Sequence, residues 1–145
     1  MGWHGTGGDC LKILIIDGQG GGLGRQLVTA VKEQYPEIEV LAVGTNSAAT
    51  NAMLRAGADR AATGENSVVV ASGQADVIMG PLGMVIADSM LGEITPQMAL
   101  AVGQSPAKRI LIPVNFCDNI IVGVTETSMT KNVENAMDAL ARLIG

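Results

Sequence analysis

The chain has 145 residues, the length of one domain, and its 48% hydrophobic and 16% charged content excludes disorder driven by low hydrophobicity. A formal net charge of −5 and single Trp, Tyr and Phe residues argue against nucleic-acid binding, which favours basic surfaces and stacking aromatic side chains. Glycine is unusually frequent, at 19 residues, against roughly 7% in an average protein.

The first half of the chain alternates short apolar runs with stretches of helical periodicity. Residues 11–16 predict a strand buried on both faces, and Leu23, Leu27 and Val31 then predict one amphipathic helix that ends before Pro36. The next elements expected are a strand at residues 38–43, a helix at 48–56, a strand or short helix at 67–71 and a strand at 75–80.

The second half of the chain continues this alternation. The elements expected are a helix at residues 97–103, a strand at 108–114, a strand at 119–124 and a helix at 130–143. The run at 119–124 follows its predecessor after only four residues, too few for a parallel crossover, so we expect it to be antiparallel or to lie at an edge. The pattern predicts a three-layer α/β, Rossmann-like domain with a mostly parallel sheet.

The sequence also bears on location. Its apolar runs are shorter than the roughly 18 residues of a membrane span, and no signal-peptide pattern is visible. We therefore expect no membrane partner and a cytoplasmic location. Cys10 and Cys117 lack metal-ligand spacing, so we expect them to be free thiols in a reducing compartment. Residues 1–10 are expected to form a flexible leader, and residues 11–145 a single domain.

The most informative segment is the glycine-rich turn between the first predicted strand and the first helix. It comprises Gly18, Gln19, Gly20, Gly21, Gly22, Leu23 and Gly24. Such a turn presents unpaired amides and the positive end of the helix dipole, and glycines let a phosphate approach without meeting a Cβ. We therefore expect these residues to bind a nucleotide phosphate; the alternative is a turn that only packs tightly.

The spacing Gly18-x-x-x-Gly22-x-Gly24 resembles the cofactor loop of short-chain dehydrogenases. This resemblance implies NAD(P) or another nucleotide as the cofactor. It stops at the loop, because the Tyr-x-x-x-Lys pair of that family is missing: Tyr35 has Glu39 four positions later. The sequence Gly-Lys-Ser or Gly-Lys-Thr is also missing, which excludes a P-loop.

Two further polar or glycine-rich segments follow predicted strands, at the sheet edge where α/β proteins bind ligands. They comprise Thr45, Asn46 and Ser47 after the second strand and Gly80, Pro81 and Gly83 after a later one. The first group could bind a ribose or a 2′-phosphate, or cap the next helix. The second could let a nucleotide approach closely, or form a tight turn.

The remaining ionisable residues favour structural roles. Asp17 could orient the glycine loop by accepting its amides, or simply shape the turn. Asp88 and Glu93 are interpreted as solvated charges, with carboxylates on a lid as the alternative. Because the sole histidine, His4, lies in the leader, we expect neither histidine-based catalysis nor a metal site.

Several segments together resemble an uncharacterised bacterial family, a domain of unknown function with a Rossmann-like fold. They are residues 17–22, 44–47, 62–66, 80–83 and 92–96. The resemblance implies the fold and brings no established activity.

Three hypotheses on function follow, in order of preference. The first is a cytoplasmic protein that binds a nucleotide or dinucleotide through its phosphates, as a sensor or as a subunit of a larger machine. The second is a small NAD(P)-dependent oxidoreductase whose site is completed by oligomerisation. The third is a structural homo-oligomer without a ligand. A homo-oligomer, such as a homodimer, is the expected assembly because so short a chain leaves little material for a separate substrate region.

Overall fold

The computed structural model describes residues 11–114, 118–125 and 128–145. The strands are β1 (Lys12–Asp17), β2 (Glu39–Gly44), β3 (Arg60–Thr63), β4 (Val77–Pro81) and β5 (Lys108–Ile112). The helices are α1 (Gly22–Gln34), α2 (Ser47–Arg55), α3 (Glu65–Ser72), the 3-10 helix η1 (Leu82–Val85), α4 (Pro96–Gln104) and α5 (Met129–Ile144).

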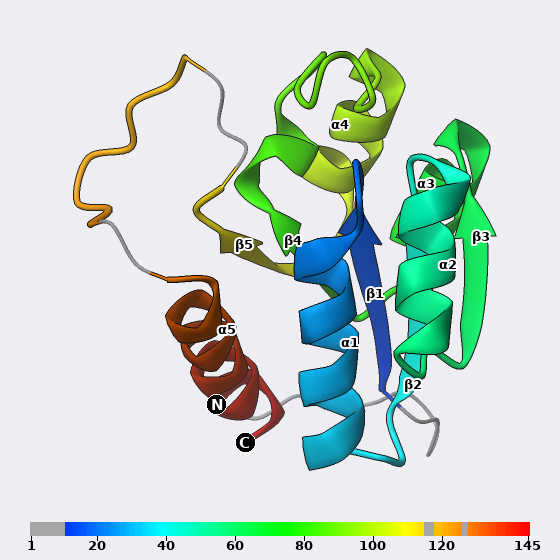
Figure 1. Ribbon diagram of the computed structural model, residues 1–145, viewed down its shortest axis with the longest axis vertical. Helices are drawn as coiled ribbons and strands as arrows, with labels where there is room; N and C mark the ends of the chain where they lie inside the picture. The colour runs from blue at the N-terminus through cyan, green and yellow to red at the C-terminus, as the bar shows by residue number, and fades with distance from the viewer. Residues whose placement is uncertain (1–10, 115–117, 126–127) are drawn as a thin grey trace.

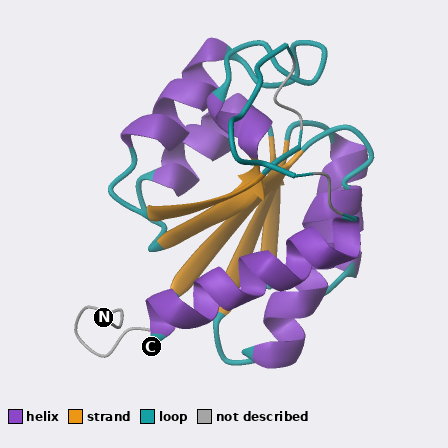
Figure 2. Ribbon diagram, turned by 90° about the vertical axis from the view of Figure 1, so that its left-hand side faces the viewer, coloured by secondary structure: helices purple, strands orange, loops and turns teal. Residues whose placement is uncertain are grey.

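The strands form one parallel sheet in the order β3-β2-β1-β4-β5. Helices cover both faces of the sheet, which gives the three layers seen in Figure 2. The strand order reverses direction between β1 and β4, the point at which doubly wound α/β proteins bind ligands. The predicted α/β, Rossmann-like fold is therefore confirmed.

The central strand β1 shows why the sheet needs two helical layers. Ile13 and Ile15 pack into the core beneath α1 and α5, whereas Leu14 and Ile16 pack into the core on the α3 and α4 side. All four side chains are at most 1% exposed, as expected for a strand that is apolar on both faces.

The helices follow the predicted patterns closely. Leu23, Leu27 and Val31 form the buried stripe of α1. Asn46 caps α2 and Thr95 caps α4, each by accepting a backbone amide from the first turn. The ambiguous segment at 67–71 lies within helix α3, and β3 is a strand that the sequence did not predict.

The predicted strand at 119–124 is wrong. Residues 118–125 contain no strand, and Ile120 and Val122 are 90% and 95% exposed. Every pair of neighbouring strands among the described residues is parallel, so the expected antiparallel edge strand is not found there. The predicted leader and both cysteines lie outside the described residues. Within the described ranges, no helix is both long and apolar enough to cross a membrane.

Candidate functional site

Asp17, the last residue of β1, holds the two ends of the glycine-rich turn together. Its carboxylate accepts the Gly18 amide at 2.8 Å and the Gly24 amide at 2.7 Å. Burial raises the pKa of the Asp17 carboxyl, and the negative charge of Glu93 adds to this effect, while the two amide bonds oppose it. Asp17 therefore orients the loop, which is one of the two roles predicted for it.

Two glycines of the turn are required by packing. Gly21 adopts a φ of +75°, and a Cβ there would lie 2.8 Å from the Ala49 Cα. A Cβ on Gly24 would lie 2.5 Å from the Met53 sulfur. These two positions let the start of α1 pack directly on α2, so tight packing explains part of the glycine-rich pattern.

Gly20 and Gly22 differ from these packed glycines. Both are exposed, and a Cβ at either would meet no atom within 4 Å. Within the described part of the chain, the amides of Gly20, Gly22 and Leu23 have no hydrogen-bond acceptor. The start of α1 therefore retains free donors at the positive end of its dipole.

A surface groove of about 560 Å³ runs from these glycines along the space between α1 and α2. Its lining comprises Gly20, Gly22, Arg25, Thr29, Ala52, Arg55 and Ala56. Both arginines are exposed, and neither forms an ion pair with any described residue. We call this the arginine groove; it combines free amides with two free guanidinium groups.

The opposite side of the turn holds Glu93, a residue that sequence reasoning interpreted as a solvated charge. Its Oε1 accepts the Gln19 amide at 2.8 Å, the Thr45 hydroxyl at 2.6 Å and the Asn46 side-chain amide at 2.9 Å. Burial alone would raise the pKa of Glu93, but these three hydrogen bonds outweigh it and lower the pKa. The interpretation as a solvated charge is therefore corrected: Glu93 is an anchored carboxylate.

No local sequence signal could have revealed this contact, because Glu93 lies far along the chain from the turn. Gly18 is the partial exception: a Cβ there would lie 2.7 Å from the Thr45 hydroxyl and 2.9 Å from Glu93 Oε1. A side chain at this position would separate the turn from the segment that carries Glu93.

The residues after β2 serve the chain's own contacts. The Asn46 side chain accepts the Ala49 amide at 2.9 Å and donates to the Gln19 carbonyl at 3.0 Å as well as to Glu93. Helix capping, one of the two predicted roles, is therefore confirmed for Asn46. Ser47 is the exposed first residue of α2.

Gly80 and Pro81, at the end of β4, and Gly83, in η1, are buried and do not line the arginine groove. A Cβ on Gly80 would lie 2.5 Å from the Ile16 carbonyl oxygen, so this glycine lets β4 lie close to β1. Pro81 ends β4, and the Gly83 amide donates to the Val114 carbonyl at 3.3 Å. Gly80 thus serves the packing of β4 on β1, and Gly83 links η1 to the residue Val114 that follows β5.

The described residues contain no group of three or more His, Cys, Asp or Glu side chains that could hold a metal ion. Fold and site together define a Rossmann-like α/β domain with a glycine-rich turn that joins the first strand to the first helix.

Within that class, the chain belongs to the family described as "Domain of unknown function (DUF3842)", whose model matches residues 12–145. A search of curated proteins finds no match. Among solved structures, the chain is similar to the dodecameric FMN-dependent Ubix-like decarboxylase from Escherichia coli O157:H7. The two are 17% identical with a TM-score of 0.44, and the match covers 91% of this chain and 75% of the other. The predicted membership of an uncharacterised domain family is confirmed.

Proposed function

We propose that the chain binds the phosphate of a nucleotide-like small molecule in the arginine groove, as a sensor or as a subunit of a larger assembly. The observation that carries this proposal is the convergence of unpaired donors. The exposed Gly20 and Gly22 amides and the unpaired Arg25 and Arg55 side chains border one groove. Backbone amides at a helix start and guanidinium groups are the donors that proteins use for phosphate.

The anchored carboxylate of Glu93 supports this choice of side. Its hydrogen bonds already use the Gln19 amide, the Thr45 hydroxyl and the Asn46 side chain. Its negative charge repels a phosphate from that face of the turn, whereas the arginine groove carries two positive charges. The ligand's anionic end is therefore directed toward α1 and α2.

The groove supports binding rather than chemistry. Thr29 supplies the hydroxyl among its lining residues, and the lining holds no carboxylate, imidazole or thiol. A general acid, a general base and an activated nucleophile are therefore missing from this described surface. For this reason we place a binding protein before the NAD(P)-dependent oxidoreductase.

Calorimetric titration with inorganic phosphate, pyrophosphate, ATP, NAD and NADP tests the proposal. Arg25→Gln and Arg55→Gln should each weaken binding by about 10-fold or more, the effect of losing one charge-assisted hydrogen bond. Lys131→Gln removes an exposed charge from α5, outside the groove, and should leave the affinity unchanged.

A thermal-shift measurement gives an independent readout. A ligand at about 100 times its dissociation constant adds about 2.7 kcal/mol to the free energy of unfolding. The proposal is wrong if none of these anions binds, or if both arginine variants bind them as tightly as the wild type does.

A further inference from the structure

The segment 118–125, which we call the arm, exposes large apolar side chains. Ile120 and Val122 are 90% and 95% exposed, and Ile121 and Val124 are 36% and 41% exposed. In Figure 1 the arm, drawn in orange, loops outward from the body of the protein between β5 and α5. Soluble monomers rarely leave such a contiguous apolar run in water, and runs of this kind mark interaction surfaces.

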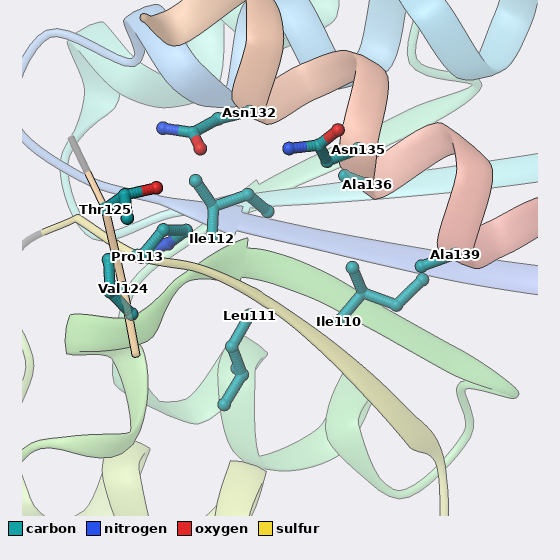
Figure 3. A pocket seen from close by; sticks show the side chains of 10 residues that line it. All are labelled: Ile110, Leu111, Ile112, Pro113, Val124, Thr125, Asn132, Asn135, Ala136 and Ala139. Carbon is teal, nitrogen blue, oxygen red and sulfur yellow. The ribbon is translucent and has the colours of Figure 1, made fainter. Parts of the chain in front are cut away.

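The edge strand β5 borders an apolar groove beside the arm. The groove has a volume of about 270 Å³, and β5 and the residues just after it contribute Ile110, Leu111, Ile112 and Pro113 to its lining. Figure 3 shows Ile110 and Ile112 pointing toward α5, with Leu111 pointing to the opposite side of the sheet. An edge strand presents backbone groups on which a further strand can pair.

The arm supplies no sixth strand within its own chain. A parallel crossover needs about a dozen residues, whereas only residues 113–117 separate β5 from the arm. An antiparallel arm would run toward the amino end of β5. The start of α5 lies at the other end, because Asn132, in its first turn, lines the groove near Pro113, which follows β5. The structure shows neither arrangement, because residues 118–125 form no strand and none of them pairs with β5.

We propose that the arm of one copy pairs in parallel with β5 of a second copy, and that the exchange is reciprocal. A parallel register that sets Ile120 beside Ile110 also sets Val122 beside Ile112. All four side chains then lie on the α5 face, since alternate residues of a strand share one face.

Charge complementarity supports this register and this occupant. The same alignment places Asp118 next to Lys108, and both side chains are exposed and lack an ion-pair partner among the described residues. The sixth strand would also place Ile120 and Val122 beside the apolar groove between β5 and α5. A twofold axis makes each copy both donor and acceptor of an arm.

The first test is the mass in solution, measured by light scattering and sedimentation over a range of concentrations. The wild type should be a dimer. The double variant Ile120→Lys and Val122→Lys should raise the dimer dissociation constant by about 100-fold or more. Leu91→Lys alters a side chain that is 98% exposed outside the arm, and it should leave the dimer intact.

The second test locates the contact. In a background with Cys10→Ser and Cys117→Ser, a copy with Ile120→Cys is mixed with a differently tagged copy with Ile110→Cys and then oxidised. The two tags should become disulfide-linked, whereas Ile120→Cys mixed with Lys131→Cys should not. Circular dichroism should show the arm variants to be folded, since the altered side chains are exposed in the single chain.

Three outcomes would overturn the inference. The wild type could be monomeric throughout, whether or not its arm binds another protein. The dimer could survive the lysine substitutions in the arm. The lysines could break the dimer while the link between positions 120 and 110 fails to form, which would place the arm on another surface.

Discussion

Replacing Gly24 by Ala tests whether close packing of α1 on α2 requires this glycine. The new Cβ would lie 2.5 Å from the Met53 sulfur, 2.8 Å from the Asp17 Cβ and 3.0 Å from the Met53 Cγ. Met53 is fully buried and cannot swing into solvent. Overpacking of this kind costs about 1–3 kcal/mol, which exceeds the gain of at most about 1 kcal/mol from replacing a helical glycine. We expect Gly24→Ala to lower the free energy of unfolding by about 1–2 kcal/mol.

Gly22→Ala is the matched control, because it lies in the same helical turn and its Cβ would meet no atom within 4 Å. It should leave the free energy of unfolding unchanged or raise it by up to about 1 kcal/mol. Urea denaturation of both variants measures the difference as a change in midpoint at constant slope. Combining Gly24→Ala with Met53→Ala should show a coupling of about 0.5–3 kcal/mol. A Gly24→Ala protein as stable as Gly22→Ala would refute the reasoning.

Two further predictions concern carboxylates. Desolvation alone would raise the pKa of Asp59, but hydrogen bonds from the Val40 amide and Lys32 outweigh it and lower the pKa. The Asp59 carboxylate therefore stabilises the folded protein above its ordinary pKa of 3.8, and this contribution is lost as the pH falls through the lower pKa of the folded state. Asp59→Asn should therefore cost about 0.5–1 kcal/mol at neutral pH, since the group is partly exposed, and the cost should fade in urea titrations carried out in acid. Glu93→Ala should speed hydrogen exchange of the Gln19 amide by about 10-fold or more. Glu93→Gln keeps a hydrogen-bond acceptor and should leave this exchange rate unchanged. Equal exchange rates in the two variants would contradict the anchoring role of Glu93.

The elements that the sequence predicts well are those with a strong periodic signal. The apolar run of β1 and the stripe of α1 repeat over enough residues to be distinguished by period alone. The caps at Asn46 and Thr95 are also readable, because capping depends on residues only three positions away. Strand β3 was missed because Arg60–Thr63 is short and its side chains are not fully buried.

The candidate site was only partly predictable for a different reason. The free amides of Gly20 and Gly22 follow from the glycine-rich turn, but the contribution of Arg55 depends on how α2 packs beside α1. Glu93 reaches the turn across 74 positions of sequence, and such a contact leaves no local pattern.

By itself the sequence determined most of the elements and the loop that joins β1 to α1, because these depend on neighbours a few residues apart. It did not determine β3, the choice between strand and helix at 67–71, or the absence of a strand at 119–124. The tertiary structure alone decided which glycines are packed and which are free, and which side of the turn carries the anchored carboxylate. It also decided that residues 118–125 form no strand. Backbone pairing and desolvation depend on what segments distant in sequence bring to the same place, and only the folded arrangement specifies this.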